Sequence, residues 1–227
     1  MLIKLKSRKN FKFLIIKTNN FINIKNEEFW NTITHFIGFI LVLIGIPFLF
    51  YFDSGINSYS KLSITIFSIG LLLVYFSSTF YHYVNEIKIK KKLQIFDHIS
   101  IYFLILGSYA PVCLITLYNS SGVLIFLIVL FLAITGTFLK LFFSVKNEHI
   151  SLLIYLVMGW LIIIDINTLF ELINLKAKIL LIASGVSYSL GVVFYYNDNI
   201  KFFHSIWHIL VLIGSTLHYL FILYHII

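Results

Sequence analysis

Charged residues are scarce in this chain. Asp, Glu, Lys and Arg together make up 11% of its 227 residues, whereas hydrophobic residues make up 60%. About a quarter of an average soluble domain is charged, so this chain has too little charge to cover a water-facing surface. Its apolar content also excludes a disordered chain. The remaining class is a polytopic membrane protein, and at about 20 apolar residues per span the length accommodates roughly seven helices.

Cysteine and arginine are almost absent. Cys113 is the single cysteine, which excludes an internal disulfide and a cluster of thiolate metal ligands. Arg8 is the single arginine, so bidentate recognition of phosphate or bases is not expected. No segment alternates with a period of two at the length of a barrel strand, and the apolar run at 13–16 is too short for a cleavable signal peptide.

Seven apolar stretches are long enough to cross a membrane as helices, which satisfy their own backbone hydrogen bonds in lipid. They cover residues 31–52, 62–84, 98–118, 122–145, 150–170, 178–196 and 203–225. The sequence therefore predicts an all-α protein with a seven-helix transmembrane domain over 29–227, preceded by a basic segment over 1–28. The multi-pass chain is expected in a cell membrane, with the plasma membrane favoured.

Basic residues are distributed unequally between the two sides of these spans. The net charge is +8. Fourteen of the 17 basic residues fall on one side: Lys4, Lys6, Arg8, Lys9, Lys12, Lys17, Lys25, Lys88, Lys90, Lys91, Lys92, Lys140, Lys146 and Lys201. Cytoplasmic loops of membrane proteins carry an excess of lysine and arginine. The side with these fourteen basic residues, which includes the N-terminus, is therefore predicted to be cytoplasmic. Because the lysines account for topology, nucleic acid is not an expected partner.

Histidines from distant segments fall at one depth in this topology. Ionisable groups inside membrane helices are costly and mark functional sites. His35, His82 and His98 lie near the cytoplasmic ends of the first three spans, and His204 and His208 open the last. His218 and His225 lie further along the last span, so they are not expected to join this cluster.

Spacing makes a metal site the favoured interpretation. His204 and His208 are four residues apart and share one helix face, so they can chelate one ion. His82 and Asp97 are expected at the same depth, and Ser78 lies one turn before His82. Three imidazoles with an open fourth position are typical of catalytic zinc. Other roles stay open: an interfacial histidine can contact headgroups, Ser78 can bond to its own helix, and Asp97 can cap the third span.

A second polar stripe lies at the start of the first span. Glu27, Asn31 and His35 follow one another at intervals of four residues, so they share a helix face. One interpretation is a helix crossing the membrane interface. The other is a set of outer partners that orient the metal ligands.

Taken together, these motifs resemble the hemolysin III family, the bacterial-type branch of the progestin and adipoQ receptor superfamily. The matching stretches are NEEFWNTITHFIG, SSTFYHYV, LQIFDHISIYFLILGSYAP, TGTFLKLFF, YLVMGW and HSIWHILVLIGSTLHY. The resemblance implies a seven-helix bundle with a zinc site near the cytoplasmic face. Its ligands would be His82, His204 and His208, with Asp97 and Ser78 completing the polar set around Zn²⁺. One departure is Ser184, which replaces the first of two glycines usual in the sixth span.

The leading functional hypothesis is a zinc-dependent hydrolase of lipid amides or esters, with membrane lipid as the partner. Asp97 would carry the proton, and Ser78 would orient water or bind the oxyanion. Whether the chain is an enzyme stays open, because related members are described as receptors as well as hydrolases. The alternatives are a pore-forming cytolysin and a receptor or regulator of lipid homeostasis with structural zinc. The sequence does not give the oligomeric state.

Overall fold

The computed structural model describes residues 2–142 and 148–227, and the predicted inner-side residue Lys146 lies outside them. The described chain is helical, without strands. In chain order its helices are α1 (Leu2–Tyr51), α2 (Ser60–Tyr83), α3 (Ile87–Pro111), α4 (Gly122–Phe142), α5 (Glu148–Trp160), α6 (Ile166–Leu172), α7 (Leu175–Tyr196) and α8 (Phe203–His225). A short π-helix, η1 (Val112–Thr116), follows α3, and a 3₁₀ helix, η2 (Leu161–Asp165), joins α5 to α6.

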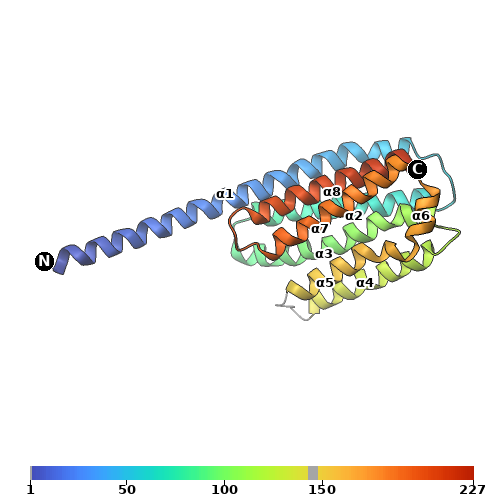
Figure 1. Ribbon diagram of the computed structural model, residues 1–227. Helices are drawn as coiled ribbons and strands as arrows, with labels where there is room; N and C mark the ends of the chain where they lie inside the picture. Colours follow the sequence, from blue (N-terminus) through green and yellow to red (C-terminus); the bar gives the residue numbers. More distant parts are fainter. Residues whose placement is uncertain (1, 143–147) are drawn as a thin grey trace.

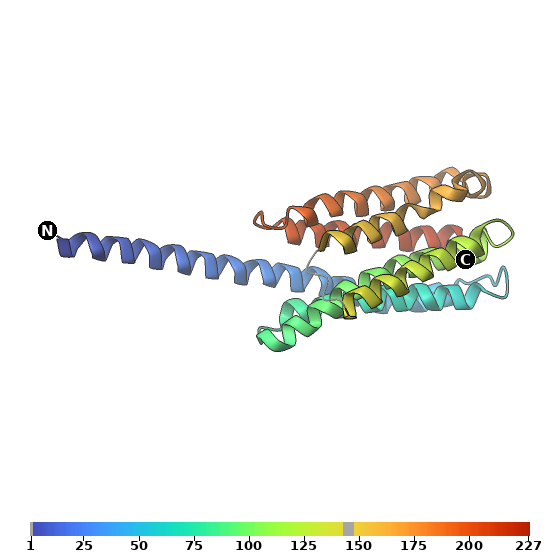
Figure 2. The same ribbon diagram turned by 90° about the horizontal axis from the view of Figure 1, so that it is seen from below.

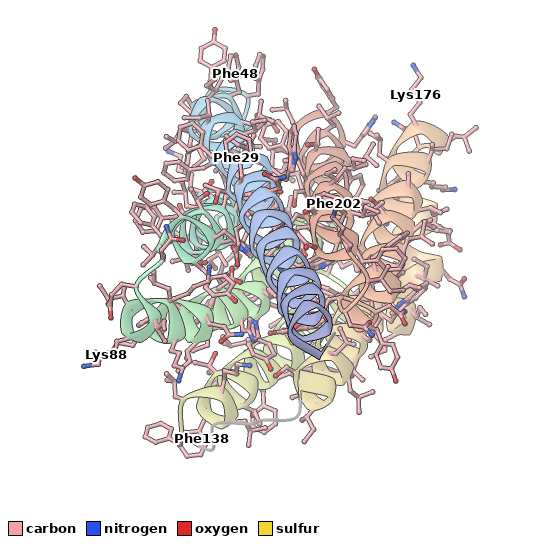
Figure 3. All side chains as sticks on the ribbon, turned by 90° about the vertical axis from the view of Figure 1, so that its left-hand side faces the viewer. Phe29, Phe48, Lys88, Phe138, Lys176 and Phe202 are labelled. Atoms are coloured by element: carbon pink, nitrogen blue, oxygen red, sulfur yellow. The ribbon has the colours of Figure 1, made fainter. Side chains whose placement is uncertain are left out.

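Seven spans in the described chain are long and apolar enough to cross a membrane. They are Asn26–Tyr51, Ser60–Tyr83, Ile87–Thr116, Gly122–Phe142, Ile150–Leu172, Leu175–Tyr196 and Phe203–His225. The predicted all-α, seven-span bundle is thus confirmed, and the chain is a multi-pass integral membrane protein. Large apolar side chains project outward around the bundle, among them Phe48 and Phe138 (Figure 3), as expected of a surface that faces lipid.

The helices run roughly alongside one another, and the first half of α1 extends beyond the bundle (Figure 1). Seen from below, α7 and α8 lie on one side and α2, α3 and α4 on the other (Figure 2). The ends of α2 and α7 and the beginnings of α3, α5 and α8 meet at one end of the bundle. We call it the histidine end, because His82 lies near the end of α2 and His204 near the beginning of α8.

Two apolar clusters form the interior. The larger joins α1, α2 and α8 through residues such as Leu49, Phe67 and Phe221, which are fully buried. The smaller joins α3, α4 and α5 around Tyr102 and Val129. Because apolar side chains gain little from leaving lipid for a protein interior, close packing rather than the hydrophobic effect holds such helices together.

The third span begins earlier than the sequence indicates. Residues 87–97, predicted as part of a connector, form the first turns of α3. The Glu86 side chain caps this helix by accepting hydrogen bonds from the amides of Lys88 and Ile89, which satisfies groups that a helix start leaves unpaired. Asp97 therefore lies well inside α3, and the alternative that it is the N-cap is wrong.

The fifth span is broken at η2, between α5 and α6. The Tyr109 hydroxyl of α3 donates to the Gly159 carbonyl at 3.1 Å and accepts from the Ile162 amide at 3.0 Å. One phenol thus bonds two backbone groups at the place where the regular helix is interrupted. A buried backbone group without a partner is costly in a membrane, so this bond allows the break to exist inside the span.

Contact between α2 and α3 depends on the absence of a side chain at Gly70. A Cβ atom there would lie 2.4 Å from the Phe103 carbonyl oxygen. We expect Gly70→Ala to push the two helices apart and to lower the free energy of unfolding by about 1–3 kcal/mol, measured by thermal unfolding in detergent. Gly185→Ala is the control, because a Cβ atom there meets no described heavy atom within 4 Å. Equal stability of the two variants would contradict this account of the packing.

Candidate metal site

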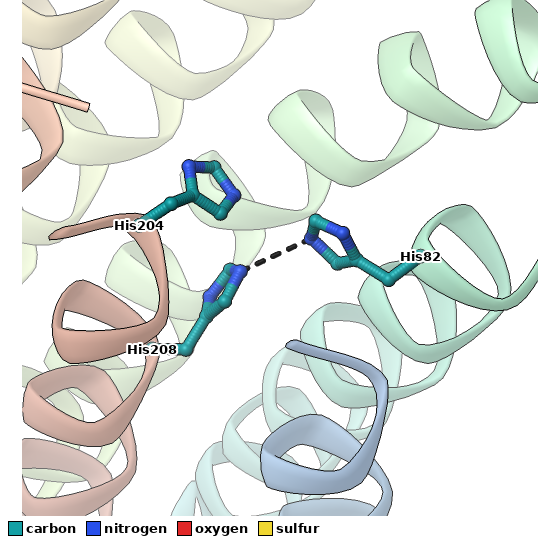
Figure 4. A group of neighbouring side chains, drawn as sticks. All are labelled: His82, His204 and His208. Carbon is teal, nitrogen blue, oxygen red and sulfur yellow. Dashed lines mark hydrogen bonds between the residues drawn. The ribbon is translucent and has the colours of Figure 1, made fainter. Parts of the chain in front are cut away.

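Three imidazoles meet at the histidine end. His82 comes from the last turn of α2, and His204 and His208 come from the first two turns of α8 (Figure 4). One nitrogen of each ring lies within 4.8 Å of the others, and the Nε2 atoms of His82 and His208 are 3.0 Å apart. The structure therefore brings the three predicted ligands together, and this group can hold a metal ion.

Each of these rings has a neighbour on its Nδ1 side. His82 Nδ1 donates to Glu28 Oε2 at 2.7 Å, and His208 Nδ1 contacts His35 Nε2. His204 Nδ1 lies 4.0 Å from Asp198 Oδ2. A carboxylate that accepts from Nδ1, as Glu28 does from His82, fixes the orientation and tautomer of an imidazole that binds a metal, and such a ring keeps the lone pair of Nε2 free.

The donor set fits a zinc ion. His204 Nε2 is buried and has no hydrogen-bond partner among the described residues. His82 donates to Glu28 through Nδ1, so its Nε2 is an acceptor, and this atom faces His208 Nε2. A buried imidazole nitrogen without a partner, as at His204, is costly, and a bound metal ion would remove that cost. Three neutral imidazoles are a known catalytic zinc set.

Ser78 and Asp97 are both buried beside this cluster. Ser78 Oγ makes no hydrogen bond to its own helix, so the predicted alternative, a bond back to that helix, is wrong; its polar neighbour is the Asp97 carboxyl group. Both side chains line one cavity. His98, predicted at the same depth, is not part of the metal-binding group; its carbonyl accepts a hydrogen bond from the Tyr155 hydroxyl at 2.6 Å.

Two members of the predicted stripe on α1 hold the beginning of α8. Asn31 Oδ1 accepts from the Ser205 hydroxyl at 2.5 Å, and Glu27 Oε1 accepts from the Phe202 amide at 2.8 Å. Phe202 has a φ of 66°, a left-handed conformation that costs a bulky residue roughly 1–2 kcal/mol. Glu27 and Asn31 therefore act on the position of the α8 helix, whereas His35 touches a candidate ligand directly.

Glu28 is the residue that the sequence interpretation missed. The choice of Glu27 followed intervals of four residues back from His35, but Glu28 lies seven residues before His35 and shares its face equally well. Glu28 also pairs with Lys90 Nζ at 2.9 Å. This carboxylate thus links His82 to a lysine in the first turn of α3. Two adjacent glutamates before an embedded histidine are the signal that points to it.

A cavity of about 360 Å³ begins at Ser78 and Asp97 and runs between the helices toward His218. Its walls are apolar for most of this length, with residues such as Leu104, Ile162 and Val211. Ligand cavities commonly combine such walls with a few polar groups at fixed positions. The cavity has room for part of a lipid-sized molecule, and it meets the histidine end through His35, Ser78 and Asp97 rather than through the three candidate ligands.

Comparison with known proteins gives consistent matches. The model of the Haemolysin-III related family matches residues 23–219. "Hemolysin-3 homolog" of Bacillus subtilis (strain 168) is 39% identical over 200 residues, which are 88% of this chain and 94% of that protein. "Hemolysin-3" of Bacillus cereus is 37% identical, over 88% and 92%. The human "Monocyte to macrophage differentiation factor" is 27% identical, over 85% and 82%.

Adjacent glutamates offer a matched test of the outer partners. We expect Glu28→Gln to weaken metal binding by about tenfold or more, because the His82 ring loses its anionic acceptor. Glu27→Gln keeps a neutral acceptor for the Phe202 amide and touches no candidate ligand, so its metal affinity should stay close to wild type. Competition with a chromophoric chelator, together with metal analysis, measures both. Equal affinities of the two variants would contradict the role given to Glu28.

Proposed function

Because this chain belongs to the Haemolysin-III related family, we propose that it is an intramembrane zinc-dependent hydrolase acting on a lipid amide or ester. The observation that carries the proposal is the placement of three facing imidazole nitrogens near Asp97 and Ser78, and these two side chains line one end of an apolar cavity. Family membership alone does not specify a reaction, whereas the residues of this site do suggest one.

His82, His204 and His208 would hold the ion through neutral imidazoles, and they therefore would not act as bases. Zinc, when bound, supplies a Lewis acid that makes water nucleophilic near neutral pH. Glu28 and His35 keep two of the rings oriented through the contacts described above. The proposed orientation places the histidine end toward the cytoplasm, in agreement with the lysine distribution, and the membrane is proposed to be the plasma membrane.

Asp97 is the proposed proton carrier. Its carboxylate would take a proton from the attacking water as the new bond forms between oxygen and the acyl carbon. It would then deliver this proton to the nitrogen or oxygen of the leaving group as the amide or ester bond breaks. The Ser78 hydroxyl, which lies beside the Asp97 carboxyl group, would donate to the developing oxyanion.

Lipid is the substrate class that suits the cavity. Its lining includes Trp160, Ile163 and Ile182, whose side chains are at least half exposed on the outside of α5, η2 and α7. The cavity is therefore bordered by side chains that also face the surrounding membrane. An apolar chain can reach such a cavity directly from the bilayer. A polar metabolite would first have to leave water and enter the bilayer.

Replacement of Asp97 separates chemistry from metal binding. We expect Asp97→Asn to lower hydrolysis of a long-chain acyl amide by about 100-fold or more, because general acid–base catalysis contributes at least that much. Zinc content should stay close to one ion per chain, since the three imidazoles are untouched. Mass spectrometry of released fatty acid and metal analysis measure the two properties. Wild-type protein without zinc, or full turnover in the variant, would defeat the proposal.

A cytolytic pore is the competing function, suggested by the name of the Bacillus cereus relative, "Hemolysin-3". The His204→Ala/His208→Ala variant, reconstituted in liposomes, distinguishes the two functions. For a zinc hydrolase, this variant should lose both metal and fatty acid release, while dye leakage stays at the level of empty liposomes for mutant and wild type. Leakage caused by both proteins alike would favour the pore.

Lower thermal stability on zinc removal, with no product from any lipid, would favour a structural ion.

A further inference from the structure

His218 lies at the other end of the cavity from the metal group and has no part in the proposed reaction. It is buried on α8, ten residues after His208, and lines the cavity together with Ser108 of α3. At the rise of a helix this separation is about 15 Å. A buried imidazole in a membrane span is costly without a partner, so its contacts decide what it does.

The backbone of α3 gives His218 one partner and fixes its tautomer. The Val112 amide bonds to the Tyr109 carbonyl instead of the Ser108 carbonyl, at the point where Pro111 and the π-helix η1 interrupt the regular pattern. His218 Nε2 lies 3.1 Å from this Ser108 carbonyl oxygen. A carbonyl only accepts, so Nε2 donates, and Nδ1 is left as an acceptor.

A second polar pair lies close by on the same wall. Tyr188 also lines the cavity; its hydroxyl is 2.9 Å from Ser215 Oγ, and Ser215 is one turn before His218 on α8. Phe67 and Phe221 pack against the His218 ring, at centroid distances of 5.8 and 5.6 Å. These aromatic neighbours fix the imidazole in place, and a rigid acceptor discriminates between ligands better than a mobile one does.

We propose that His218 is a specificity-determining residue that accepts a hydrogen bond from a hydroxyl group on the acyl chain of the ligand. The inference rests on the proposed function, because the cavity end at Ser78 and Asp97 would hold the acyl carbonyl. An extended chain advances about 1.2 Å per single bond. With the acyl carbonyl at the depth of His208, the separation of about 15 Å along α8 to His218 places the hydroxyl roughly twelve bonds from the carbonyl carbon.

Binding of fatty acids to the zinc-loaded full chain tests this inference without requiring turnover. The probes are dodecanoic acid and its ω-hydroxy derivative, with the octanoic and hexadecanoic pairs as length controls, measured by calorimetry in detergent. We expect wild type to bind the hydroxylated dodecanoic acid about fivefold more tightly than the plain acid, the effect of one net hydrogen bond. The preference should be smaller for both other lengths.

His218→Leu should abolish the preference while plain dodecanoic acid binds as in wild type. His225→Leu is the matched control, since it removes an imidazole from the same helix outside the cavity, and it should keep the preference. His218→Gln retains a donor for Ser108 and an acceptor, so a partial preference is expected even if the leucine variant does not fold. Equal affinities for the two acids in wild type, or a preference that survives in folded His218→Leu, would overturn the inference. Neither outcome depends on whether any lipid is hydrolysed.

Discussion

The contact between the end of α2 and the beginning of α8 is the constraint on which the site depends. His82 and His208 approach across these two helices, although 126 residues separate them in the chain. α1 maintains this contact from outside. Glu28 touches the α2 ring and His35 touches the α8 ring, so one helix positions ligands on two others.

Position along a helix could be predicted from the sequence, but the identity of neighbours across helices could not. The apolar runs placed the seven spans, and the lysine distribution placed His82, His204 and His208 at one depth, where the structure brings them together. Periodicity shows which residues of α1 share a face, but it does not show toward which helix that face is turned. It therefore could not distinguish Glu27 from Glu28 as the partner of His82. The conformation of Phe202 and the break at η2 depend on bonds between distant segments, which carry no local signal.

Irregular backbone in this bundle coincides with the cavity. The break at η2 and the π-helix η1 both lie beside it, and side chains from other elements satisfy the backbone groups that regular helices would have paired: Tyr109 at η2 and His218 at the end of α3. Such departures persist within a membrane where protein, rather than lipid, surrounds them. The polar groups of the cavity wall thus follow from the backbone geometry of the helices that enclose it.

α1 also has a mechanical consequence for the histidine end. It runs without interruption from Leu2 to Tyr51, so the helix that carries Glu27, Glu28, Asn31 and His35 also extends about 36 Å beyond Asn26. A continuous helix transmits tilt along its length. A force on the projecting half, from a lipid headgroup layer or another protein, would therefore be transmitted along the helix to the four side chains that set the geometry of the site. The basic segment thus couples whatever binds it to the candidate metal ligands.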